Sequence, residues 1–373
     1  LMELQMKKPV ALTILLAAFS LQSASAQDLA GVDIPYERHV LDNGLTVLMH
    51  VDNTAPQAFV NVYYKVGSRD EKPGKTGFAH LFEHLMFNGS ENYDGEYFAP
   101  IQDVGGSLNG DTWFDRTRYY QTVPNTALER VLWLESDRMG HLLGAVTQEK
   151  LDNQRGVVQN EKRRGDNRPY AMVFEKTIAG LFPEGHPYSW ETIGSMEDLN
   201  AASLEDVHEW FKTWYGAGNA IVSIAGDIDP QETLALVEAH FGDIPPGPPV
   251  SHLDDWVPER TIDTFETYQD RVANPLIMRS WAVPGRDHEA STLLSLAARI
   301  LGGDSSSRLY RRLVKDEKIA IDASMNTLQF DLSTIAYMQV VLNPDADADR
   351  ARAIVAEELA RFAAEGPTET ELE

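Results

Sequence analysis

The chain has 373 residues, a length that accommodates two domains. Its formal net charge is -25, from 57 acidic and 32 basic residues, and this argues against a nucleic-acid partner because phosphate binding needs clustered Lys and Arg. The absence of cysteine excludes disulfides, thiol catalysis and cysteine-ligated zinc, so any metal must be held by His, Asp or Glu.

Residues 1–26 have the pattern of a signal peptide. Lys7 and Lys8 form a positive segment, and residues 10–21 form an apolar core that is short for a membrane span. An A-x-A-like cleavage site then ends at Ala26. A short membrane anchor is the alternative interpretation of the same segment. We expect an exported protein, in the periplasm of a bacterium, with no membrane association after signal removal.

Strand and helix patterns alternate along the rest of the chain. Residues 38–52 alternate apolar and polar side chains and predict a hairpin, and residues 58–71 continue as a strand. Residues 105–124 predict two strands with a turn at Asn109-Gly110. Helices are expected at residues 78–89, 125–143 and 147–164, and a strand followed by a helix at 219–245. The predicted fold class is α+β, with mostly antiparallel sheets packed against helices.

A proline-rich break at residues 244–255 is followed by a second occurrence of the same pattern. The matching segments keep one order at offsets of roughly 215 to 220 residues, which predicts two homologous domains, 27–248 and 256–373. The second copy would lack the counterpart of the strand at 219–226, so we expect a fragment of a longer protein. The matched segments are 66–71 with 283–289, 114–123 with 330–341, and 147–152 with 368–373.

The segment FAHLFEHLMFNG, residues 78–89, carries the chemistry. His80 and His84 are four residues apart, so on a helix they share one face, about 5–6 Å apart. Two imidazole nitrogens can then bind one zinc ion at about 2.0–2.1 Å. Glu83 can reach a water at the open zinc position, whose pKa the metal lowers towards about 7, and take its proton. The same carboxyl can return the proton to the leaving amine of a cleaved peptide.

A catalytic zinc site needs a third protein ligand from elsewhere in the fold. Without cysteine, a carboxylate is the natural choice, and Glu161 on the helix predicted at 147–164 is a candidate. The alternative for the motif is a buried helix whose histidines only pack in the core. Two histidines at this spacing around a glutamate favour the metal. One zinc ion per chain is expected, preferred over manganese or cobalt on ligand type.

The order H-x-x-E-H marks the inverted zincins, or inverzincins. The chain resembles the pitrilysin/insulinase family of zinc metallopeptidases, which includes the mitochondrial processing peptidase, and in particular its N-terminal, zinc-bearing half. The resemblance covers nearly all of residues 36–373. It implies that Glu161, separated from His84 by 76 residues and set in VVQNEKRR, is the third ligand. It also implies that Asn109, in GGSLNGDTWFDRTRYY, contacts the substrate.

Two departures from the family pattern qualify this resemblance. The family often has a second Glu seven residues before the ligand, where this chain has Gln154. An amide can still accept a hydrogen bond from a ligating His, so we expect Gln154 to support the site. In the family two halves close into a chamber, and the half without zinc supplies an Arg and a Tyr. Residues 313–321 contain no Tyr, so a C-terminal half or a homologous partner chain is expected to supply these groups.

Together these patterns predict a secreted zinc metalloendopeptidase that hydrolyses short or unfolded polypeptides. His80, His84 and Glu161 are the predicted metal ligands, and Glu83 is the predicted general base and acid. We expect the substrate to pair as an extended strand with the edge strand near Asn109. Two alternatives remain: a non-catalytic peptide-binding or assembly subunit, which the intact motif disfavours, and a zinc hydrolase of small molecules, which the two-domain repeat disfavours.

Overall fold

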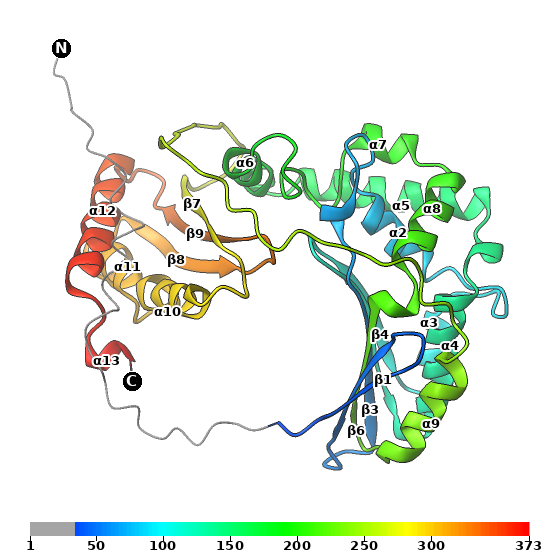
Figure 1. Ribbon diagram of the computed structural model, residues 1–373. Helices are drawn as coiled ribbons and strands as arrows, with labels where there is room; N and C mark the ends of the chain where they lie inside the picture. The colour runs from blue at the N-terminus through cyan, green and yellow to red at the C-terminus, as the bar shows by residue number, and fades with distance from the viewer. Residues whose placement is uncertain (1–33, 373) are drawn as a thin grey trace. The chain divides into compact units, whose positions relative to one another are not determined.

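The computed structural model describes residues 34–372, so the predicted signal peptide lies outside the described residues. This part of the chain divides into two compact units (Figure 1). The first unit comprises residues 34–167 and 185–252, and the second comprises residues 168–184 and 253–372. The predicted domain division stays a prediction. Among the described residues, no helix has the length and apolarity needed to cross a membrane.

The first unit is built on a six-stranded sheet with the order β1-β2-β6-β3-β5-β4. Neighbouring strands are antiparallel except β2 and β6, which run parallel. The strands are β1 (Glu37–Val40), β2 (Thr46–Val51), β3 (Gln57–Tyr64), β4 (Ser107–Thr112), β5 (Thr117–Pro124) and β6 (Ala220–Gly226). The helices are α2 (Phe78–Leu85), α3 (Phe98–Gln102), α4 (Leu128–Gly140), α5 (Gln148–Asp166), α7 (Met196–Ala201), α8 (Leu204–Trp214) and α9 (Pro230–Phe241).

Alternating side chains give the sheet of the first unit one buried face. In β3, Val60, Val62 and Tyr64 are fully buried, whereas Phe59 on the other face is exposed. Strand side chains alternate between faces, so the buried set forms one apolar layer. Each such aliphatic side chain contributes about 1.5–3 kcal/mol when it is removed from water. The helices pack against this layer, which holds α2 against the sheet.

The predicted helices at 78–89, 125–143 and 147–164 are confirmed as α2, α4 and α5. The longest of them, α5, begins after Thr147, whose hydroxyl oxygen accepts a hydrogen bond from the Lys150 N–H at 3.2 Å. This cap satisfies one of the free N–H groups of the first turn. The start of α5 is therefore determined by local sequence. This helix contains two of the predicted site residues, Gln154 and Glu161.

The predicted turn at Asn109-Gly110 is wrong. Both residues lie inside β4, where Asn109 pairs with Tyr120 of β5, and the hairpin turns at residues 113–116. A Cβ built on Gly110 would lie 3.1 Å from ring atoms of Phe87, so the glycine permits a close approach of the strand to this ring. Packing against Phe87, two residues after α2, thus explains the glycine, and the local Asn-Gly signal does not decide the turn.

The second unit repeats the central topology of the first. Its three antiparallel strands have the order β7-β9-β8, which matches β3-β5-β4, and α10 follows β7 as α2 follows β3 (Figure 1). The predicted fold class is confirmed. The elements are α6 (Met172–Leu181), β7 (Leu276–Pro284), α10 (Ala290–Gly302), α11 (Arg308–Tyr310), a π-helix (Arg311–Asp316), β8 (Ala320–Leu328), β9 (Ser333–Leu342), α12 (Ala348–Glu365) and α13 (Glu369–Leu372).

Candidate metal centre

Helices α2 and α5 bring the three predicted metal ligands together. The imidazole rings of His80 and His84 lie 4.8 Å apart on one face of α2. On α5, the Oε2 atom of Glu161 is 3.7 Å from His80 Nε2 and 3.5 Å from His84 Nε2. Nitrogen and oxygen ligands of tetrahedral zinc lie roughly 3.3–3.5 Å apart at bonds of about 2.0–2.2 Å. The arrangement and its donor types therefore fit a zinc ion.

The electrostatic surroundings of His80 and the hydrogen bonding of His84 suit metal ligands. Burial, together with a smaller effect of the neighbouring His84, lowers the pKa of His80 to about 3. A neutral imidazole carries one ring proton and leaves one nitrogen lone pair for a metal. The Nδ1 atom of His84 lies 3.3 Å from Gln154 Oε1, an acceptor, so the proton of this ring belongs on Nδ1. That leaves the Nε2 lone pair facing Glu161.

Glu83 lies next to these ligands on the same helix, and only 8% of it is exposed. The ligand atoms of His80, Glu83 and His84 all lie within 4.8 Å of one another. Burial raises the pKa of the Glu83 carboxyl to about 7, although a hydrogen bond from Thr112 acts in the opposite direction. A cation bound nearby would lower this pKa again. Glu83 is thus a buried carboxyl that can exchange protons with a group bound beside the imidazoles.

Gln154 connects His84 to the end of α2 through a closed set of hydrogen bonds. Its Oε1 accepts from His84 Nδ1, and its Nε2 donates to Asn88 Oδ1 at 3.2 Å. The Asn88 side chain in turn donates to the His84 carbonyl oxygen at 2.8 Å. The position needs an acceptor at one end and a donor at the other, which an amide provides and an ionised carboxylate does not. The Gln154 amide can therefore donate to Asn88 while it accepts from His84.

Replacing Gln154 with Leu is expected to weaken zinc binding by roughly 10–100-fold, the usual effect of removing a group that orients a ligand. The change removes the acceptor of the His84 Nδ1 proton and leaves the ligands themselves intact. Competition with a chromophoric chelator measures the affinity. The matched control is Gln159→Leu on the same helix, whose side chain donates to Asn200 instead. Equal affinities in both variants would contradict an orienting role of Gln154.

The Asn109 side chain is not brought together with the ligands. Asn109 lies on β4, at the edge of the sheet, and its Oδ1 accepts from the Gly110 N–H at 2.9 Å. Because strand side chains alternate, Gly110 and Thr112 face α2 and Asn109 faces away from it. At this position a bound peptide would therefore contact the backbone of the edge strand β4.

Sequence reasoning missed Glu71, which lies before α2. Its carboxylate accepts hydrogen bonds from the Gly77 N–H at 3.1 Å, the Ala79 N–H at 2.8 Å and Trp190 Nε1 at 2.9 Å. These bonds satisfy free N–H groups of the first helical turn, and burial raises the pKa of the Glu71 carboxyl well above its usual range. The separation of six positions between Glu71 and Gly77 exceeds the spacing of a capping box, so no local signal marks this contact.

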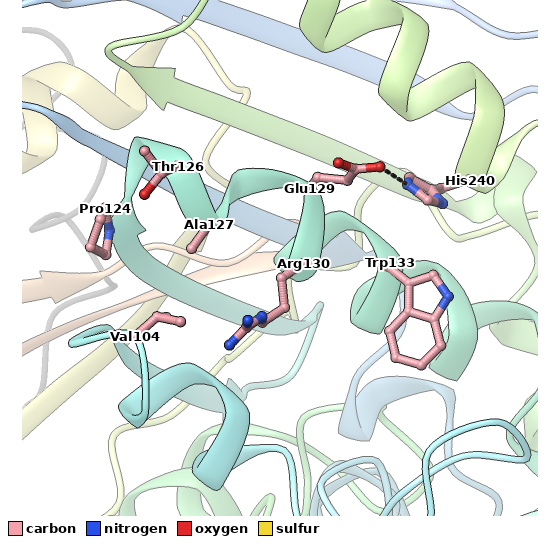
Figure 2. Close-up of a pocket in the computed structure, with 8 residues that line it drawn as sticks. All are labelled: Val104, Pro124, Thr126, Ala127, Glu129, Arg130, Trp133 and His240. Atoms are coloured by element: carbon pink, nitrogen blue, oxygen red, sulfur yellow. Dashed lines mark ion pairs between the residues drawn. The ribbon is translucent and has the colours of Figure 1, made fainter.

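A separate open pocket lies at the beginning of α4 (Figure 2). Its volume is about 560 Å³, and Trp133, Arg130, Glu129 and His240 are among its lining residues. The Glu129 Oε1 and His240 Nε2 atoms are 3.8 Å apart across it. The pocket includes none of the predicted ligands, so it is distinct from the metal centre.

Comparisons with known proteins agree with this geometry. Residues 46–186 match the family model described as Insulinase (Peptidase family M16), and residues 201–373 match the model described as Peptidase M16 inactive domain. Zinc protease PqqE of Helicobacter pylori (strain ATCC 700392 / 26695) is 30% identical over 326 residues, which cover 84% of this chain and 71% of the relative.

Solved structures show the same fold. A protease from Helicobacter pylori has a TM-score of 0.81 at 28% identity, covering 91% of this chain and 82% of that chain. The periplasmic protease PqqL from Escherichia coli has a TM-score of 0.72 at 20% identity, covering 91% of this chain and 39% of that chain, a similarity of fold.

Fold and site together define a zinc metallopeptidase-like protein. The chain belongs to the insulinase family of peptidases, peptidase family M16, which confirms the predicted family. The family includes inactive domains as well as zinc proteases, so membership alone leaves activity to be established by the site.

Proposed function

We propose that this protein is a zinc metalloendopeptidase that hydrolyses peptide bonds in short or unfolded polypeptides. The observation that carries the proposal is the convergence of His80, His84 and Glu161 beside the buried carboxyl of Glu83. A zinc ion held there would supply Lewis-acid chemistry and a water that is nucleophilic near neutral pH. Glu83 takes the proton of the attacking water and returns it to the leaving amine.

The substrate pairs as an extended strand with the free edge of β4. Backbone pairing of this kind provides affinity without reading most side chains, so sequence preference is modest. The residues of β4 that face α2, Gly110 and Thr112, approach Glu83. A peptide bound along this edge therefore runs close to the proton acceptor, with Asn109 beside it on the outer face.

The proposal also includes export from the cytoplasm and cooperation with a second, homologous half of the peptidase. The predicted signal peptide, residues 1–26, would place the chain in the periplasm, the compartment named for PqqL. The zinc-bearing domain, 27–248, and the second homologous domain, 256–373, would act with a C-terminal half or a homologous partner chain. That half would supply the Arg and Tyr that hold the substrate.

A non-catalytic peptide-binding or assembly subunit is the second candidate function. The match of residues 201–373 to a domain described as inactive favours it. The H-x-x-E-H motif lies in the other match, residues 46–186, and it is intact. The site residues thus favour the enzyme over the subunit.

The purified protein is expected to cleave an unstructured, internally quenched fluorogenic peptide, to lose this activity with a chelator and to regain it with zinc. Catalysis depends on the ion, so both changes should be complete. Lengthening the peptide from a few residues to about twenty should increase kcat/KM, because strand pairing needs an extended segment. Equal cleavage of single amino-acid derivatives would favour a small-molecule hydrolase. Absence of cleavage, with zinc bound and a homologous half added, would favour the non-catalytic subunit.

A further inference from the structure

The hydroxyl group of Thr112 contacts the carboxyl group of Glu83. Thr112 is the last residue of β4, and its Oγ1 donates to Glu83 Oε2 at 2.6 Å. This distance is typical of a strong O–H···O bond to a carboxylate. It is the one hydrogen bond that the described residues make to this carboxyl. Because Glu83 is almost fully buried, bulk water cannot readily replace the bond.

A second point of β4 restricts the same side chain. A Cβ built on Gly110 would lie 3.2 Å from Glu83 Oε1 and 3.1 Å from the Phe87 ring, so the strand backbone passes close to the carboxyl. Gly110 and Thr112 are two residues apart and face the same side of the strand. One oxygen of Glu83 therefore lies against the backbone of β4, and the other accepts the hydrogen bond from Thr112.

We propose that Thr112 is a positioning residue for Glu83. This inference rests on the proposed function, in which Glu83 accepts the proton and β4 pairs with the substrate. The hydrogen bond fixes the carboxyl to the strand that orients the peptide. The distance between the proton acceptor and the scissile bond is then set within one rigid element. Displacements of about 1 Å in such an arrangement can cost about 10²-fold in rate.

The test compares Thr112→Val, which keeps the shape and removes the hydroxyl, with Thr112→Ser, which keeps the hydroxyl. We expect kcat to fall roughly 10–100-fold in Thr112→Val, with KM within about twofold and zinc content unchanged. Thr112→Ser should stay within about threefold of the unmodified protein in kcat, because serine can donate the same bond. The matched control is Thr122→Val on β5, which should leave kcat unchanged.

Crystal structures of the metal-free variants provide a readout that does not depend on activity. The Glu83 carboxyl is expected to keep its position in Thr112→Ser and to move by about 1 Å or more in Thr112→Val. An unmoved carboxyl in Thr112→Val would overturn the proposal, whether or not the protein cleaves peptides. A protein that cleaves nothing, but whose carboxyl moves as expected, would contradict the proposed function alone.

The kinetic outcomes that would overturn the proposal are also distinct. An equal loss of kcat in Thr112→Val and Thr112→Ser would show that keeping the hydroxyl does not preserve activity, so the hydrogen bond would not be what positions the carboxyl. A kcat within twofold of the unmodified protein in Thr112→Val would show that the hydrogen bond does not position the carboxyl. A change confined to KM would make Thr112 part of the peptide-binding edge instead.

Discussion

The Glu83→Gln protein is expected to bind zinc as the unmodified protein does and to cleave peptides about 10²–10⁴-fold more slowly. The amide has the shape of the carboxyl but cannot take a proton from the attacking water. The three metal ligands are unchanged, and the Thr112 hydroxyl can still donate to the amide oxygen. Zinc content measured by elemental analysis, together with kcat on the fluorogenic peptide, separates loss of metal from loss of proton transfer.

The matched control for this change is Glu149→Gln, an exposed glutamate on the first turn of α5. It removes the same charge from the same unit without touching the site, so its activity should equal that of the unmodified protein. Retained cleavage by Glu83→Gln would refute the assigned role of Glu83. A loss of zinc in Glu83→Gln would mean that its carboxyl is needed to hold the ion, which the present assignment does not predict.

The sequence predicts well those site residues that lie close together along the chain. His80, Glu83 and His84 lie within one and a half turns of α2, so helical geometry alone puts them on one side. The position of Glu161 depends on how α5 packs against α2, so the sequence made Glu161 only a candidate ligand, and the family resemblance singled it out. The structure brings its carboxylate within 3.5–3.7 Å of both imidazoles.

The contacts that sequence did not reveal are those made between distant segments. Glu71 reaches the first turn of α2 across a loop, and Thr112 reaches Glu83 from a strand that begins more than twenty residues later. At Asn109-Gly110, in contrast, the sequence predicted a turn that the structure does not have. The local turn preference of this pair is real, but the close packing of Gly110 against α2 determines the conformation. Local propensity predicts elements, while packing between elements determines which side chains meet.

Zinc is expected to raise the melting temperature of the unmodified protein and to leave that of His84→Ala unchanged. A ligand that binds only the folded state stabilises it by about 4.1 kcal/mol at a free concentration of 1,000 times Kd. In a unit of about 150–250 residues this corresponds to roughly 8–16 °C. His84→Ala removes one of the three converging donors, and its loss should weaken binding by more than the roughly 10–100-fold typical of an orienting group.

The comparison is made for each variant with and without zinc, so that any effect of the substitution on the metal-free fold cancels. Differential scanning calorimetry measures both melting temperatures. His141→Ala, at an exposed position just after α4, should keep the full zinc-dependent shift. A shift that survives in His84→Ala would place the ion elsewhere and refute the ligand set. A shift that disappears in His84→Ala and Glu161→Gln but persists in Glu83→Gln would separate the groups that hold the metal from the group that moves the proton.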